Sequence, residues 1–147
     1  MLPKPFATAV ALVLIVACQL SPGEAAGQEE VPSVAVETLL RKYPGAEGIE
    51  WGRDRNDSHE AHFEHDGRKL RADFDEVGVW IETEESVDWD ELPEAVRRAV
   101  EGEYDRDDIV ELEHTDSAEK GEFYDVEIDP KGEKKFDVEY RADGTKL

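Results

Sequence analysis

Three of the four histidines in this chain lie within one short stretch, SHEAHFEHDGRKL, at residues 58–70. They are spaced three residues apart and stand between carboxylates. Imidazole nitrogens and carboxylate oxygens are common ligands of zinc and other divalent metals. The stretch therefore forms either a metal site or a pair of strands that happens to carry histidines.

The local sequence favours the pair of strands. Asp66-Gly67 is a strong signal for a two-residue hairpin, because a type I′ turn needs positive φ at both central positions. A turn at this point predicts that residues 59–65 pair with residues 68–74, and this register places apolar side chains opposite one another.

Alternation along this strand places His59 and His65 on the core side and His62 on the solvent side. His59 and His65 are then about 20 Å apart at about 3.3 Å per residue, too far to share one metal ion. HEAH also lacks the spacing of the HExxH zinc motif. Glu60, His62 and Asp73 remain weak metal candidates, and we expect no firm metal site and no cofactor.

Common catalytic motifs are missing from the sequence. Glu60 is expected to face Asp73, and Asp125 to face Asp137; such pairs could share a proton or hold Ca²⁺, or simply be screened surface charges. The chain has no G-x-S-x-G, no phosphate-binding glycine loop and no Cys/His zinc spacing. We therefore predict no catalytic residues and a protein that is not an enzyme.

Three aromatic side chains are candidates for binding a partner. Trp80 and Phe123 lie in predicted strands at positions expected to face outward, and Trp89 lies in a predicted connection. Exposed tryptophans are favoured anchors of protein interfaces. The alternative is that two packed units bury Trp80 and Trp89 between them.

The chain resembles itself at an offset of 61 residues. Residues 31–51 align without a gap with residues 92–112, and RADFDEVG, residues 71–78, resembles DVEYRADG, residues 137–144. Each aligned region opens with the i, i+3, i+4, i+7 apolar pattern of a helix, followed by alternating strand patterns. We predict an α+β fold in which a helix and an antiparallel four-strand meander are repeated in tandem. The helix packs on one sheet face.

The predicted units are residues 31–87 and residues 88–147, and the last strand of the second unit is truncated at Leu147. The N-terminal region resembles an export signal. Residues 1–17 contain a short apolar run after Lys4, and residues 18–30 are typical of a flexible tether. Ile15–Cys18 resembles a lipobox, which favours lipidation of Cys18; cleavage by a conventional signal peptidase is the alternative. We expect a periplasmic or outer-membrane lipoprotein of the cell envelope, or otherwise a secreted protein.

The formal net charge is −21. Such a field repels nucleic acid and anionic membranes and attracts basic partners or divalent cations. We therefore expect no nucleic acid partner, and contact with a membrane only through the N-terminal anchor.

A family resemblance rests on the helix that ends in KYPGA, the following IEW, and HEAHFEHDGRKLRADFDEVGVWIETE at residues 59–84. These features resemble the PepSY-like family of exported bacterial proteins, which is similar to β-lactamase-inhibitor protein. The second unit departs from the pattern, because Asp105-Arg106-Asp107 replaces Pro-Gly-Ala. The resemblance implies an exported, non-enzymatic domain that binds other exported proteins, and it brings no inhibitory residues with it.

We predict a protein-binding module, an inhibitor or modulator of an exported enzyme such as a protease. Its partner is expected to be another exported or envelope protein, and a basic one. The alternative is an acidic envelope protein that binds divalent cations.

Overall fold

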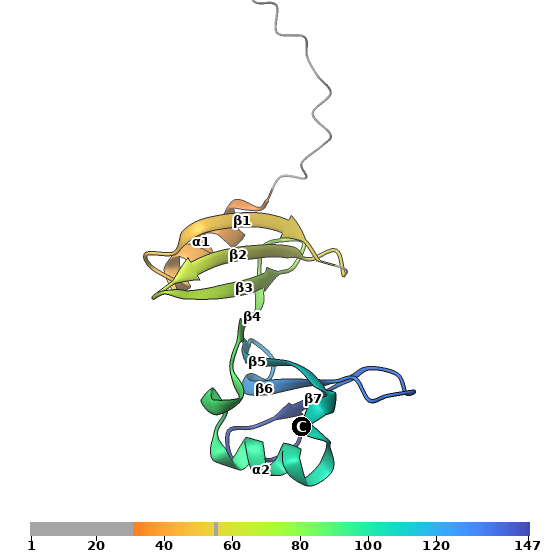
Figure 1. Ribbon diagram of the computed structural model, residues 1–147. Helices are drawn as coiled ribbons and strands as arrows, with labels where there is room; N and C mark the ends of the chain where they lie inside the picture. The colour runs from red at the N-terminus through yellow and green to blue at the C-terminus, as the bar shows by residue number, and fades with distance from the viewer. Residues whose placement is uncertain (1–30, 55) are drawn as a thin grey trace, which may run out of the picture.

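The computed structural model describes residues 31–54 and 56–147 of the chain. One seven-stranded antiparallel sheet, in the order β1-β2-β3-β4-β5-β6-β7, forms its centre. Figure 1 shows β4 running from an upper group of strands with α1 to a lower group with α2. The elements are α1 (Ser33–Lys42), β1 (Glu47–Arg53), β2 (His59–His65), β3 (Arg68–Phe74), β4 (Trp80–Ser86), η1 (Trp89–Glu91), α2 (Glu94–Glu103), η2 (Arg106–Asp108), β5 (Ile109–Ser117), β6 (Gly121–Ile128) and β7 (Phe136–Tyr140).

The predicted fold, a tandem repeat of one helix and a four-strand meander, is wrong. β4 pairs with β5 from Glu82↔Ser117 to Ser86↔Glu113, so that all seven strands form one continuous sheet with two short helices. Among the described residues only three strands follow α2. Pairing β4 with β5 satisfies backbone donors and acceptors that separate sheets would leave open. Hydrophobic periodicity assigns faces to strands, but it does not say which strand edges meet.

The predicted hairpin at Asp66-Gly67 is confirmed. Both turn residues have positive φ, 52° and 79°. β2 and β3 pair from His59↔Phe74 to His65↔Arg68 without a break. This register fixes which side chains of the two strands point away from the helices.

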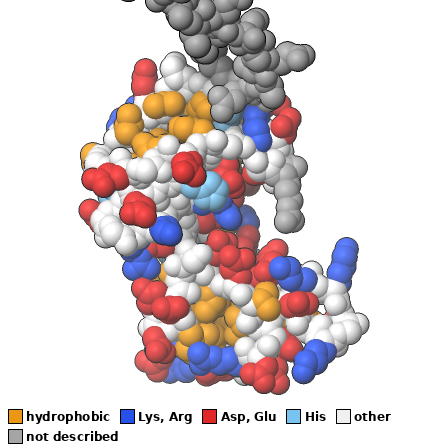
Figure 2. Space-filling model, turned by 45° about the horizontal axis from the view of Figure 1, so that its top comes forward, with side chains coloured by type: hydrophobic (Ala, Val, Ile, Leu, Met, Phe, Trp, Pro, Cys, Tyr) orange, Lys and Arg blue, Asp and Glu red, His pale blue; other side chains and the backbone are white. Residues whose placement is uncertain are grey.

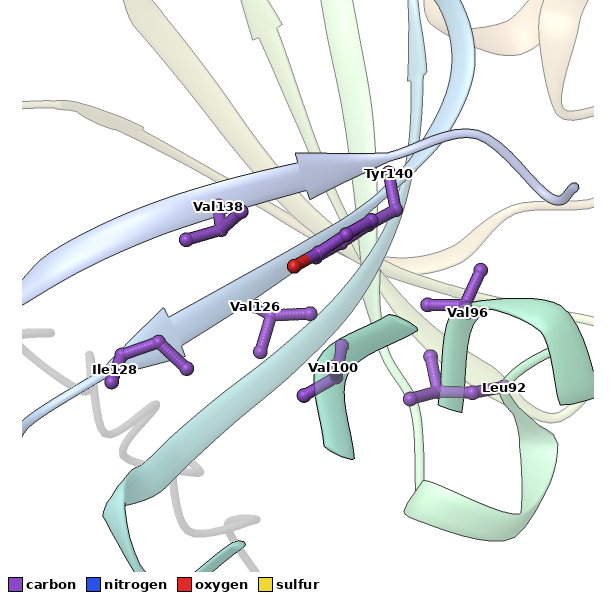
Figure 3. Packing of buried hydrophobic residues seen from close by; sticks show 7 residues of the cluster. All are labelled: Leu92, Val96, Val100, Val126, Ile128, Val138 and Tyr140. Atoms are coloured by element: carbon purple, nitrogen blue, oxygen red, sulfur yellow. The ribbon is translucent and has the colours of Figure 1, made fainter. Parts of the chain in front are cut away.

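Both helices pack on the same face of the sheet. α1 buries Ala35 and Leu39 against a cluster that includes Phe63 and Phe74. Figure 3 shows the corresponding cluster of α2, in which side chains of the helix region meet those of β6 and β7. Its buried members are Leu92, Val96, Val100, Val126, Ile128, Val138 and Tyr140.

One glycine turn packs closely against the start of each helix. Gly78 has φ of 88°, and a Cβ there would lie 2.8 Å from the Ala35 backbone nitrogen. Gly144 has φ of 83°, and a Cβ there would lie 2.7 Å from the Ala95 carbonyl oxygen. Both the positive φ and the close backbone approach require glycine.

Candidate functional site: the acidic face

The sheet face opposite the helices carries mostly carboxylates. Strand pairing and side-chain alternation bring acidic residues of β2 to β7 together on it. We call this surface the acidic face. Its carboxylates are Glu60, Asp73, Glu82, Glu84, Glu111, Glu113, Asp125, Glu127, Asp137 and Glu139.

Arg71 lies at the centre of the acidic face and contacts carboxylates from three other strands. Its Nε donates a hydrogen bond of 2.5 Å to Glu84 Oε2. The same atom lies 3.7 Å from Glu60 Oε2, and Nη2 lies 3.6 Å from Glu113 Oε1. One guanidinium therefore offsets several negative charges across β2, β3, β4 and β5.

Three carboxyl groups of the acidic face hold their protons unusually strongly. Burial, and next the charge of Glu84, raises the pKa of both Asp73 and Glu113 to about 7. Burial, and next the charge of Asp137, raises the pKa of Asp125 to about 7. Within the described part of the chain, Asp73 Oδ1 and Asp125 Oδ1 are buried and have no hydrogen-bond partner, which accounts for the desolvation. The charge of the acidic face therefore changes near neutral pH.

A broad groove follows the acidic face. Its volume is about 710 Å³, and acidic side chains dominate its lining. Figure 2 shows acidic side chains gathered between the upper and lower parts of the molecule. A concave surface lined by one sign of charge concentrates the field and suits a cationic ligand. The lining residues are Arg53, Asp54, Asn56, Glu60, Arg71, Asp73, Glu82, Glu84, Glu111, Glu113, Asp125, Glu127 and Asp137.

The weak metal candidates lie close together on this surface. His62 Nε2 lies 2.7 Å from Glu60 Oε1, and Glu60 is directly opposite Asp73. Across residues 31–54 and 56–147, no group of three or more His, Cys, Asp or Glu side chains has a geometry that could hold a metal ion.

The other histidines lie where the hairpin places them. His59 is buried and on the helix side, while His65 is half-buried and 3.3 Å from the Pro44 carbonyl oxygen. The second predicted acid pair is corrected by the register, because Asp125 faces Glu139 and Glu127 faces Asp137.

The aromatic candidates are distributed over both faces. Trp80 is half-buried on the helix side; its Nε1 donates to Thr83 Oγ1 at 3.0 Å, and Lys42 Nζ lies 3.5 Å from the ring centroid. Trp89 packs against the α2 cluster, with the Arg106 guanidinium 4.0 Å from its ring centroid.

Phe123 lies on the acidic face opposite Thr115 and is only 3% exposed. Trp80 and Phe123 are thus less exposed than their outward-facing prediction implies. Trp80 packs against the α1 cluster, and Lys120 Nζ lies 5.2 Å from the Phe123 ring centroid. Their role in partner binding stays a prediction.

The cluster around Arg71 was not predicted from the sequence. The alternation of Glu82 with Glu84 and of Glu111 with Glu113 was a usable signal, since residues two apart share a face. Recognising the cluster also requires the pairing of β4 with β5, which brings Glu84 and Glu113 to the same guanidinium.

Comparisons with known proteins identify relatives of this fold. The family model described as "Putative beta-lactamase-inhibitor-like, PepSY-like" matches residues 56–145. A BLIP-like protein from Bacteroides fragilis matches with a TM-score of 0.68 and 23% identity, over 82% of this chain and 86% of that chain.

A second solved structure, described as "putative periplasmic proteins" from Bacteroides eggerthii, matches with a TM-score of 0.67 and 21% identity. The match covers 80% of this chain and 86% of that chain. At these identities the two structures show the fold alone. The search of curated proteins finds no match. No helix within the described part of the chain is both long and apolar enough to span a membrane.

Proposed function

This chain belongs to the PepSY-like, beta-lactamase-inhibitor-like family, and we propose that it is an exported, non-enzymatic module that binds a basic protein on its acidic face. The relative from B. fragilis is called BLIP-like, which supports a role in binding another protein. The relative from B. eggerthii is called periplasmic, which supports location in the cell envelope.

The observation that carries the proposal is the excess of carboxylates on a concave, continuous face. Ten carboxylates and two arginines line the groove. A partner with a cationic surface gains electrostatic attraction there and is steered toward the groove, and the gain falls as salt rises. We further propose that the partner is an exported enzyme such as a protease, whose activity this protein inhibits or modulates.

Affinity capture tests the proposal. The immobilised protein is exposed to the native envelope and secreted fractions at low and physiological salt. A triple variant, Glu111→Gln, Glu127→Gln and Asp137→Asn, removes three charges from the acidic face. The expected result is one stoichiometric partner that this variant no longer retains.

A matched control removes the same number of charges from the exposed helix surfaces, through Glu37→Gln, Glu94→Gln and Glu101→Gln. It should retain the partner. Equal loss from both triple variants would mean that net charge alone governs capture, and it would contradict a site on the acidic face.

Binding of divalent cations is the competing function. The density of carboxylates around Glu60 and Asp73 favours it, and the geometry of the described side chains does not. Calorimetric titration with Ca²⁺ and Zn²⁺ distinguishes the two, because saturable binding of a single ion, lost with Asp73→Asn, would support the cation function.

Anchoring through Cys18 is part of the proposal, although Cys18 lies outside the described residues. Labelling with a radioactive fatty acid should mark the wild-type protein and leave Cys18→Ser unlabelled. Labelling of both would place the lipid elsewhere.

A further inference from the structure

Strand register arranges carboxylates of the acidic face in rows that cross the sheet. In the first row, Glu60 lies opposite Asp73, and Asp73 lies opposite Glu82, over β2, β3 and β4. Residues directly opposite on neighbouring strands have Cβ atoms about 5 Å apart, and like charges in such a pair oppose folding. The middle carboxyl group of this row therefore has an acidic neighbour on both sides.

A second row of the same kind crosses β5, β6 and β7. Glu113 lies opposite Asp125, and Asp125 lies opposite Glu139. The counter-charge in this row belongs to its outer member, because Lys120 Nζ lies 2.6 Å from Glu139 Oε1. Asp125, like Asp73, thus lies between two carboxylates.

The third row differs by having a counter-charge at its centre. It consists of Glu111, Glu127 and Asp137. Lys135 Nζ lies 2.7 Å from Oε2 of its middle member, Glu127. By contrast, Asp73 Oδ1 and Asp125 Oδ1 are buried and have no hydrogen-bond partner among the described residues. A buried carboxyl group between two carboxylates is more easily neutralised by a proton than an isolated one.

The charges around these groups agree with the register. The groups that face Asp73 are Asp54, Glu60, Arg71, Glu82 and Glu84. Those that face Asp125 are Glu84, Glu113, Asp137 and Glu139. Those that face Glu113 are Arg71, Glu84, Glu111 and Asp125. Carboxylates predominate in each set, and burial together with these charges raises the pKa of all three groups to about 7.

We propose that a cationic partner binds the acidic face with release of protons from the rows of Asp73 and Asp125, so that its affinity increases as the pH rises through neutrality. A lysine or arginine of the partner beside either row replaces the proton as counter-charge, and the proton passes to water. This inference rests on the proposed function and specifies how binding at the acidic face is regulated.

The two rows also set a requirement on the partner. Asp73 in β3 and Asp125 in β6 are three strands apart in the sheet, about 14 Å at about 4.8 Å per strand. A single small cation cannot lie beside both. The partner therefore needs two separate cationic groups to displace protons from both rows.

The coupling between protons and partner is reciprocal. A partner that binds the ionised carboxylates more tightly lowers their pKa, and a lower proton concentration strengthens binding of the partner. One proton released completely from a group whose pKa is about 7 changes the affinity about tenfold between pH 6 and pH 8.

The test titrates the purified full chain with N-acetylated hexalysine amide, whose side chains stay charged from pH 6 to pH 9. Calorimetry at constant ionic strength, in buffers of different ionisation enthalpy, measures both the affinity and the number of protons released. We expect the affinity to increase about tenfold or more from pH 6 to pH 8. Protons should be released at pH 7 and not at pH 9.

A triple variant, Asp73→Asn, Glu113→Gln and Asp125→Asn, removes the proposed source of the protons. Because it resembles the protonated state of the acidic face, it should bind hexalysine at pH 8 as weakly as the wild-type protein does at pH 6. It should release no protons at pH 7.

Two controls separate these groups from other ionisable residues. The helix-surface variant with Glu37→Gln, Glu94→Gln and Glu101→Gln should retain the tenfold change and the proton release. His62 is tested by itself, because its Nε2 lies 2.7 Å from Glu60 Oε1 and histidines also change charge between about pH 5 and pH 8. His62→Gln should leave the proton release unchanged.

Saturable binding without proton release at pH 7 would overturn the inference, and so would proton release that persists in the triple variant or disappears in His62→Gln. Absence of hexalysine binding at pH 8 would also overturn it. All of these results leave capture of a native partner intact. Failure of the proposed function is a different result, in which hexalysine releases protons but affinity capture retains no native partner.

Discussion

β3 and β7 end in the same kind of turn, but they differ in their position in the sheet and in the charge that they place on the acidic face. Each ends in a glycine turn that fits against the first turn of a helix. β3 is an interior strand and places Arg71 among carboxylates, whereas β7 is an edge strand and places Asp137 beside Asp125. In this fold, the backbone conformation at the end of a strand and the charge that the strand places on the acidic face therefore vary independently. Around β3 a single arginine, Arg71, contacts three carboxylates. Around β7 two lysines each pair with one carboxylate, Lys120 with Glu139 at 2.6 Å and Lys135 with Glu127 at 2.7 Å.

Substitutions in the glycine turns after β3 and β7 should have the largest effects on stability. Gly78→Ala and Gly144→Ala should each lower the free energy of unfolding by about 2–4 kcal/mol. In both turns the new Cβ would meet backbone atoms at 2.7–2.8 Å, and φ is positive. Urea denaturation measures the change.

Gly132→Ala is the control for φ alone, because Gly132 has φ of 85° with no atom within 4 Å of the added Cβ. It should lower the free energy of unfolding by about 1 kcal/mol. If Gly144→Ala lowered the free energy of unfolding no more than Gly132→Ala, the close contact between the Gly144 turn and α2 would not contribute to stability.

Arg71→Gln tests the counter-charge of β3. Removing the guanidinium takes away the positive charge that faces Glu60, Glu84 and Glu113. The free energy of unfolding should therefore fall by about 1–3 kcal/mol at neutral pH, after allowance for solvent screening. The loss should shrink at about pH 5, where Glu113 is protonated.

The control is Arg98→Gln in α2. Arg98 pairs with Glu94 at 3.2 Å on an exposed surface, and its loss should change stability by about 0.5 kcal/mol or less. Similar effects of the two variants would mean that Arg71 is an ordinary surface charge.

Local chemistry could be predicted from the sequence, and long-range pairing could not. The hairpin at Asp66-Gly67 followed from the φ requirement of its turn, and its register placed His59 correctly on the helix side. The continuous sheet was missed because edge pairing of β4 with β5 leaves no periodic signal. Asp125 was placed opposite Asp137 instead of Glu139, because no two-residue turn fixes the hairpin between β6 and β7.

The candidate site was only partly predictable for the same reason. Alternating acids identified an acidic, solvent-facing surface, including Glu60 opposite Asp73. The contact of Arg71 with Glu113 joins β3 to β5, two strands that are distant in sequence. Such contacts follow from the fold as a whole.

The pH dependence of stability tests the protonation of the acidic face. Asp73, Glu113 and Asp125 have folded pKa values of about 7, above their unfolded values near 4. The folded state therefore binds more protons than the unfolded state. The stabilisation from these three carboxyl groups is complete below about pH 4 and is lost as the pH rises through about 7. Tm should fall by several degrees between about pH 5 and about pH 8.

Asp137→Asn tests whether the pKa of Asp125 and the pKa of Asp73 are raised by different neighbouring charges. It should lower the pKa of Asp125 and leave that of Asp73 unchanged, because the charge of Asp137 raises only the former. Side-chain carboxyl NMR titration measures both groups. A Tm that rises steadily from about pH 5 to about pH 8 would contradict the raised pKa values.

The smallest effect is expected from Tyr140→Phe, which gives β7 the residue that β3 carries at its end, Phe74. Both rings are fully buried, and the Tyr140 hydroxyl has no hydrogen-bond partner among the described residues. A buried hydroxyl without a partner opposes folding, so the variant should be neutral or more stable by up to about 1 kcal/mol. Thermal and urea denaturation check this. A loss of stability of about 1 kcal/mol or more would show that the Tyr140 hydroxyl is hydrogen-bonded. Tyr104→Phe would then test the Tyr104 hydroxyl as its partner, because the stability losses of the two variants would not add in the double variant.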